Sequence, residues 1–386
     1  MDYIDAGPVA TVSLNTVVQS QFREGCFSSP DDPCSLPTGF PVHLDSQLAW
    51  SGAQFKHHAE YVLQLTGAEL SEVSSALHKF KGLELDGDLV TRDNFPLPTL
   101  ESKLAAISHD LHDGKGFSVI RGINPNDYSV EDLTTIWLGL QAHIADEPGR
   151  QDHKGNMLVH IVADSSSKMK AGHHRHSTAA ITFHNEEAGD VVSWLTRSTA
   201  AAGGKCIIAS AYTIYNVLAA HRPDIIRTLA KSDWPFAMPR FQCRPVIYNH
   251  ESRLIMNLSG RSHLIGSDIH PRPDHLPKVT DRQREALDAI EAIAQATQLE
   301  IQTQAGDMHF INNLAVLHRR EGFVDGSTGQ EKRHLVRMRL RNSQLGWAIP
   351  DALQRGWHDA FDKKAIKTWH LAPMPGDEFP LRKYTN

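Results

Sequence analysis

The feature that most constrains this chain is the segment Ile181-Thr-Phe-His-Asn-Glu-Glu-Ala-Gly189, which contains the His-x-Glu pair His184 and Glu186. On a β-strand, side chains two positions apart point to the same face, so this imidazole and this carboxylate can converge on one cation. The neighbouring Glu187 would then point the other way, and we expect it on the surface. The segment therefore predicts a strand that supplies two metal ligands.

A third ligand has to come from a distant strand, and His309, His318 and His334 compete for that role. His318 ends the segment Asn312-Asn-Leu-Ala-Val-Leu-His318, 134 residues after His184. His309 is more simply explained as a strand-surface residue. Two histidines and one carboxylate on one side of an ion leave three positions open, which is the arrangement that a ferrous ion needs to hold a co-substrate and oxygen together.

Two arginines follow this candidate ligand. Arg333 lies 15 residues after His318, and Arg337 comes four residues later on a predicted strand, so both should face the same side. A planar guanidinium forms paired, charge-assisted hydrogen bonds with a carboxylate, and either arginine could therefore bind a carboxylic acid. Ion pairing at the surface is the alternative for each.

Six motifs occur along the chain in a characteristic order: His184-x-Glu186, Gly203-Gly204, Gly306-Asp307, Asn312-Asn313, His318 and Arg333. In this order the sequence resembles the Fe(II)/2-oxoglutarate oxygenases, and in particular the fungal branch of the TauD/TfdA and clavaminate-synthase-like group, from about residue 39 to 357. The resemblance selects His318 through the family's Asn-Asn-x-x-x-x-His pattern. It implies that His184, Glu186 and His318 bind Fe(II), that Arg333 holds the 2-oxoglutarate co-substrate, and that O2 takes the remaining position.

The resemblance also suggests roles for positions around the metal. Cys206 stands where relatives often carry Thr or Ser beside the co-substrate, so we expect that hydroxyl contact to be absent. Gln151 begins a region that lies near the substrate in relatives, and Arg337 either supports the co-substrate or faces a substrate anion. Arg339 replaces an aromatic residue common in fungal relatives.

The expected substrate follows from two of these residues. Glu186 stands where most relatives carry Asp, and it resembles the members that hydroxylate amino acids, while Arg337 could hold a substrate carboxylate. We therefore expect oxidation of an unactivated C–H bond, by hydroxylation, desaturation or ring closure, in an amino acid or derivative in secondary metabolism. A larger biosynthetic intermediate is the alternative.

Two other classes of function use a similar barrel or a similar set of ligands. A zinc hydrolase can bind its metal through two His and one Glu, but the sequence has no His-Glu-x-x-His motif and Arg333 would have no purpose. A non-catalytic cupin-like binding protein would keep the barrel without the complete triad. No Gly-x-Gly-x-x-Gly follows a strand, so no nucleotide-cofactor domain is expected.

Short strands with polar turns and interrupting helices predict a mainly β fold with flanking helices, a double-stranded β-helix (jelly roll, cupin-like), rather than a parallel α/β sheet. Residues 1–40 read as an extended lead-in, and 41–386 as a single oxygenase domain with its core at about 115–345. A hairpin with strands at 241–248 and 253–258 is expected across 249–252, and 262–277 should be a loop that could serve as a lid. Expected helices lie at 66–80, 100–112, 130–144, 215–221, 223–229 and 280–296, and the first and last of these begin with the capping boxes Thr66-x-x-Glu69 and Thr280-x-x-Gln283. Expected strands lie at 117–122, 157–161, 190–196, 205–209, 300–303, 308–311 and 334–340.

Composition excludes several classes of partner. The net charge of −6, with no Lys/Arg block, argues against a nucleic-acid surface, and no run approaches the roughly 20 apolar residues of a membrane span. Four scattered cysteines favour free thiols, although Cys26 and Cys34 are near enough in sequence to pair. The histidines of 173–176 are expected to be solvated or hydrogen-bonded. We expect a small-molecule substrate, a cytoplasmic location and a chain that could form a homodimer.

Overall fold

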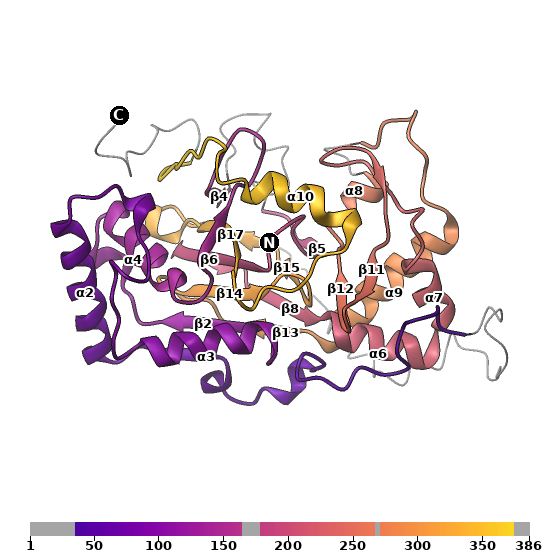
Figure 1. Cartoon of the computed structure of the whole chain (residues 1–386), viewed down its shortest axis with the longest axis horizontal. Helices are drawn as coiled ribbons and strands as arrows, with labels where there is room; N and C mark the ends of the chain where they lie inside the picture. The colour runs from indigo at the N-terminus through magenta and orange to yellow at the C-terminus, as the bar shows by residue number, and fades with distance from the viewer. Residues whose placement is uncertain (1–34, 164–177, 267–270, 374–386) are drawn as a thin grey trace, which may run out of the picture.

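Two β-sheets lie face to face at the centre of the molecule, with helices on both sides (Figure 1). The computed structural model describes residues 35–163, 178–266 and 271–373. Three parts of the chain therefore lie outside the described residues: Cys26 and Cys34, the histidine cluster at 173–176, and most of the lead-in. The predicted jelly roll is confirmed.

The larger sheet has seven strands in the order β1-β2-β14-β6-β17-β3, with β4 also paired to β17. The first pair, β1 and β2, is parallel, and the other pairs are antiparallel. The strands are β1 Val62–Gln64, β2 Phe117–Arg121, β3 Glu147–Gly149, β4 Val159–Val162, β6 Val191–Ser198, β14 Met308–Asn312 and β17 His334–Arg341.

The smaller sheet is entirely antiparallel and has four strands in the order β13-β8-β15-β5. These strands are β13 Leu299–Ile301, β8 Cys206–Ser210, β15 Val316–Arg320 and β5 Ile181–His184. β5 is an edge strand, and its Phe183 amide donates to Glu291 of a helix beside it (3.1 Å). The sheet thus places the predicted metal-binding segment at its open edge.

Alternation along the strands decides which side chains fill the space between the sheets. In β6, Val192 and Trp194 belong to the cluster between the sheets, whereas Val191 and Leu195 pack on the outer face. In β8, Ile208 faces inward in the same way. This period of two is the physical reason why short strands with apolar residues on both faces form a layered sandwich.

Helices cover the outer face of each sheet. α2 Gly67–Gly82, α3 Glu101–His112 and α4 Val130–Ala142 pack on the larger sheet, and α6 Ala211–His221, α7 Pro223–Leu229 and α9 Asp281–Thr297 pack on the smaller one. In Figure 1 the first group lies at the left and the second at the right. All six helices were predicted within a few residues, two of them from their capping boxes, which the structure confirms at Thr66 and Thr280.

Three local predictions differ from the structure. The hairpin forms between β11 Ile247–His250 and β12 Arg253–Met256, and is shorter than expected because 242–243 pair elsewhere, as β10 with β9. The expected loop at 262–277 begins with one helical turn, α8 Ser262–Ile265. Helix α10, Asp351–Phe361, was not predicted. The remaining short elements are β7 Ala202–Gly203, β9 Pro235–Phe236, β10 Gln242–Cys243, β16 Phe323–Val324 and the 3-10 turns Gly52–Gln54, His58–Glu60, Gly87–Leu89, Pro125–Asp127 and Gly329–Glu331.

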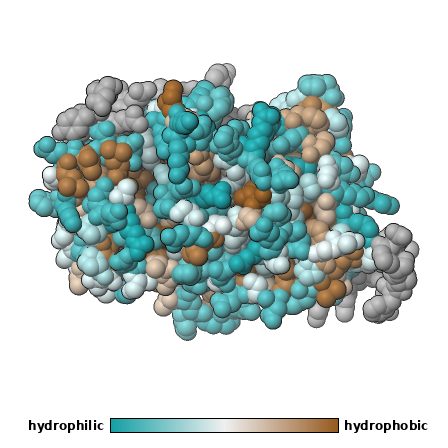
Figure 2. All heavy atoms as spheres, in the orientation of Figure 1, coloured by the Kyte–Doolittle hydropathy of each residue, from teal (hydrophilic) through white to brown (hydrophobic). Residues whose placement is uncertain are grey.

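The face of the molecule drawn in Figure 2 is largely polar. A group of hydrophobic atoms lies at the left of this face, over the end that carries α2 and α4. Within the described ranges, no helix is both long and apolar enough to cross a membrane.

Candidate metal centre

One large cavity opens beside the edge of the smaller sheet. Its volume is about 1160 Å³, and its walls come from both sheets, the segment 237–242 and helix α10. The cavity is lined by the predicted site residues Gln151, His184, Glu186, Cys206, His318, Arg333 and Arg337. The structure therefore brings every predicted site residue to a single cavity.

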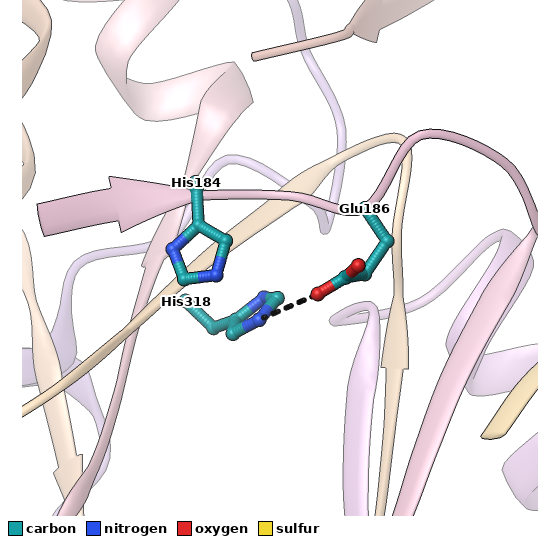
Figure 3. A group of neighbouring side chains, drawn as sticks. All are labelled: His184, Glu186 and His318. Carbon is teal, nitrogen blue, oxygen red and sulfur yellow. Dashed lines mark ion pairs between the residues drawn. The ribbon is translucent and has the colours of Figure 1, made fainter. Parts of the chain in front are cut away.

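His184 and His318 meet because β5 and β15 are neighbouring strands. The two residues are direct cross-strand partners, and their ring centroids lie 4.3 Å apart. With Glu186 they form a group whose potential ligand atoms all lie within 4.8 Å of one another. Figure 3 shows the three side chains directed toward a common space. Among the described residues, no other cluster of three or more His, Cys, Asp or Glu meets this criterion.

The protonation of the two imidazoles suits metal binding. Burial and the neighbouring His184 hold the pKa of His318 well below its ordinary value, so this ring is neutral and keeps a lone pair. The Nδ1 atom of His184 lies 2.9 Å from the Thr182 carbonyl, so it carries the proton and donates it. A ring fixed in this way presents Nε2 as the ligand.

Glu186 lies just beyond β5, which ends at His184. Its carboxylate is largely buried, lies 3.8 Å from His318 Nε2, and accepts a hydrogen bond from Arg337 Nη1. Arg337, in β17, also lies 3.4 Å from the Gln151 Oε1 atom through its Nη2. The pair Arg337 and Gln151 thus stands directly beside the three potential ligands.

Arg333 also lines the cavity and is only 7% exposed. The prediction that Arg333 lies on the same strand as Arg337 is wrong, because β17 begins one residue later, at His334. Arg333 nevertheless lines the same cavity as Arg337. Its guanidinium lies over the Phe323 ring, 5.3 Å from the centroid, and its Nη1 has no hydrogen-bond partner among the described residues. Burial lowers the pKa of Arg333 to about 9, and the group remains a cation at neutral pH. A buried cation with an unused donor is a site for an anion.

Gly204 and Cys206 form the wall beside Arg333. Gly204 has φ +73°, and a Cβ there would lie 3.1 Å from Arg333 Cδ, so the close approach of the arginine requires glycine. Burial raises the pKa of the Cys206 thiol to about 12, which makes it a neutral wall of the cavity.

Two expectations about neighbouring residues are wrong. Glu187 is not a free surface carboxylate, because both of its oxygens lie 3.0 Å from Nη2 of the buried Arg244. His309 is not on the surface either: it is buried between the sheets, where its ring stacks on Trp194 at 4.9 Å. The third candidate, His334, faces His160 at 2.9 Å and takes no part in the metal group.

Sequence reasoning gave no role to two residues that shape the site. Trp194 lies between His309 and His318, 5.9 Å from the His318 ring, and forms part of the cavity wall. Its inward position follows from the alternation in β6, which could have identified it. Asn313 holds the main chain around Glu186, and nothing local in the sequence indicates this contact.

The chain is similar in sequence to known proteins. Residues 80–339 match the family described as "Taurine catabolism dioxygenase TauD, TfdA family". The chain is 31% identical over 349 residues to the taurine hydroxylase-like protein SAT17 of Stachybotrys chartarum, covering 86% of this chain and 89% of that protein. It is 22% identical to FR-33289 synthase of Streptomyces rubellomurinus, covering 83% and 96%.

Solved structures show the same fold at lower sequence identity. An asparagine oxygenase in complex with Fe(II), a 3-hydroxyasparagine and succinate has a TM-score of 0.56 at 15% identity, covering 74% of this chain and 98% of its own. The non-heme iron oxygenase OrfP in complex with Fe and alpha-ketoglutaric acid has a TM-score of 0.55 at 15% identity, covering 73% and 94%. The chain belongs to the TauD, TfdA family of non-haem iron, 2-oxoglutarate-dependent dioxygenases.

Proposed function

We propose that this chain uses Fe(II), 2-oxoglutarate and O2 to oxidise an unactivated C–H bond of a small, carboxylate-bearing substrate, with His184, Glu186 and His318 as the iron ligands. The observation that carries the proposal is the convergence of two imidazoles and one buried carboxylate within 4.8 Å at the wall of a large cavity. Two nitrogens and one oxygen on one side of an ion are the donor set expected for non-haem iron.

The co-substrate is assigned to the part of the cavity that Arg333 lines. The unused Nη1 donor and the low exposure of this arginine support its pairing with the distal carboxylate of 2-oxoglutarate. Cys206 lies beside it as an apolar contact and offers no hydroxyl. An ion bound by the three ligands supplies oxygen activation coupled to the decarboxylation of 2-oxoglutarate to succinate.

The remaining residues prepare the site for this chemistry. Trp194, which belongs to the cluster between the sheets, lies against the His318 ring and would keep water from that side of it. Arg337 and Gln151 stand beside the ligands and would hold the substrate so that one C–H bond faces the metal. Such orientation decides which position is attacked.

The proposed substrate is an amino acid or a close derivative. Arg337 supports this assignment because it is a second arginine at the cavity, separate from the co-substrate anchor, and by exchanging its contacts with Glu186 or Gln151 it could bind a substrate carboxylate. The relatives support it too: one is an asparagine oxygenase, and another, OrfP, was solved with a hydroxy-L-arginine.

A larger biosynthetic intermediate is the second candidate, and the size of the cavity favours it. The volume of about 1160 Å³ exceeds the roughly 300–1,000 Å³ typical of pockets for drug-sized ligands. A free amino acid and 2-oxoglutarate together would leave much of that space to water, whereas an amino acid carried on a larger molecule would fill it.

Succinate release separates these alternatives. Wild type and Arg337→Ala would be assayed with Fe(II), 2-oxoglutarate and, as substrates, the twenty amino acids, taurine, alkyl and aryl acids, and bulky neutral compounds. Stimulation by an amino acid that is lost in Arg337→Ala would support the first candidate. Stimulation only by a bulky neutral compound would reject it, and activity with Zn(II) in place of Fe(II) would reject the oxygenase.

The broader organisation is part of the proposal. We propose that residues 41–386 act as a single oxygenase domain, that the enzyme works in the cytoplasm and that it could form a homodimer. Size-exclusion chromatography with light scattering measures the oligomeric state directly.

A further inference from the structure

The main chain around Glu186 is held by the side chain of Asn313. The Asn313 Oδ1 atom accepts a hydrogen bond from the Glu186 amide (2.7 Å), and its Nδ2 donates to the carbonyls of Glu186 (3.1 Å) and Gly189 (3.0 Å). Asn313 is fully buried, and its main-chain N–H donates to the Asp190 carbonyl (2.7 Å). The Asn313 side chain thus forms hydrogen bonds with the main chain at both ends of the segment 186–189.

Asn185 fixes the preceding residue from the other side. Its Oδ1 atom accepts from the Leu258 amide (2.7 Å), and its Nδ2 donates to the carbonyls of Met256 and Asn313 (2.7 Å for the latter). Asn185 is 1% exposed. The two asparagines are therefore joined to each other and tie the segment to β12 and to the turn between β14 and β15.

This network matters because β5 ends at His184, two residues before Glu186. Beyond the strand, cross-strand hydrogen bonds no longer determine which way a side chain points. Two carboxylates follow, Glu186 toward His318 and Glu187 toward Arg244. A rotation of this short segment could exchange them, so some other contact has to select Glu186.

We propose that Asn313 is a positioning residue that fixes the segment after β5 so that Glu186, and not Glu187, faces His184 and His318. The inference rests on the proposed function, in which Glu186 is an iron ligand. Asn313 is not among the residues that line the cavity. It acts through the Glu186 main chain, as groups behind the ligands of metal sites generally do.

The neighbouring Asn312 provides a matched control. It has the same side chain, is equally buried and also makes three hydrogen bonds through that side chain: with Leu111 (2.8 Å), Leu314 (2.9 Å) and Ala315 (3.1 Å). None of these bonds reaches the segment 184–189. Loss of Asn312 should therefore destabilise the fold to a similar extent without rotating Glu186.

The experiment compares wild type, Asn313→Ala and Asn312→Ala as purified full chains. Co(II) affinity would be measured by calorimetry, the Co(II) absorption bands would report the ligand geometry, and urea unfolding of the metal-free chain would give stability. We expect Asn313→Ala to bind Co(II) about 10- to 100-fold more weakly and with altered bands, the range typical when groups behind metal ligands are removed. Asn312→Ala should keep the wild-type bands and bind within about twofold of wild type, since its bonds end outside the ligand segment.

Equal affinities and identical bands in the two variants would overturn the inference. If Asn313→Ala does not fold, Asn313→Asp provides the same comparison, because it retains the acceptor for the Glu186 amide and loses only the two donor bonds. A wild-type chain that bound no divalent metal would instead reject the proposed function, so the two failures are distinguishable.

Discussion

Replacing Arg333 tests the co-substrate site most directly. Arg333 is 7% exposed, and its Nη1 atom has no partner among the described residues. Truncating one partner of a buried, hydrogen-bonded charge pair costs about 2–5 kcal/mol. At about 1.4 kcal/mol for each factor of ten, Arg333→Ala should raise the 2-oxoglutarate concentration needed for half-maximal rate by roughly 30-fold to several thousand-fold.

The assay is succinate formation, with 2-oxoglutarate titrated against wild type and variants at saturating Fe(II). Arg333→Lys should recover only part of the loss, because an ammonium keeps the charge and lacks the planar fork. Arg320 offers a matched control: it is 6% exposed and lies over the same Phe323 ring at 5.0 Å, but its Nη2 already donates to the Ala179 carbonyl (2.6 Å). Arg320→Ala should change the 2-oxoglutarate requirement much less. An unchanged requirement in Arg333→Ala, with a large increase in Arg337→Ala, would refute the reasoning and move the anchor to Arg337.

Three further outcomes are expected. His318→Ala and His184→Ala should each lose binding of one divalent ion per chain while the circular dichroism spectrum stays that of wild type; full metal binding by His318→Ala would show that the third ligand is another residue. Burial lowers the pKa of His160 to about 4, below its unfolded value near 6.5, so this histidine binds fewer protons in the folded chain than in the unfolded one. Its own contribution to stability, fully present above about pH 6.5, should be lost as the pH falls and amounts to on the order of 3 kcal/mol by pH 4. His160→Gln should flatten that part of the pH profile in urea unfolding, and an unchanged slope would contradict this assignment. Thr280→Ala removes the acceptor for the Gln283 main-chain N–H (3.2 Å) at the start of α9 and should lower the free energy of unfolding by about 1 kcal/mol. Ser71→Ala, at an exposed position within α2, is the control. Equal losses of stability in the two variants would argue against a capping role for Thr280.

Much of the fold follows from local pattern. The capping boxes at Thr66 and Thr280 and the apolar, β-branched composition of 190–196 are local signals, and they predicted α2, α9 and β6 within a few residues. The expected strand carrying both His184 and Glu186 was too long, because pairing with β15 ends at His184. Strand length depends on the partner, which local sequence does not reveal.

The candidate metal ligands were predictable because they are chemically distinctive residues in a fixed order along the chain. The ion pairs that hold the surrounding structure in place were not predictable. Asp307 was recognised only as part of a Gly-Asp motif, but it forms a two-pronged ion pair with Arg121, 186 residues away in sequence (2.8 Å). Glu187 likewise finds Arg244 only in three dimensions. Such partners lie far apart along the chain, and any of many arginines could have filled the role.

The pairing of His184 with His318 has a consequence for how the chain folds. The two residues are direct partners across β5 and β15 although 134 positions separate them in sequence. Closing so long a loop is entropically costly and slow compared with forming helices such as α2 or α9. In a refolding experiment, helical circular dichroism should therefore recover well before the chain acquires tight metal affinity, and the rate of metal capture would report when the last long-range strand pairing is complete.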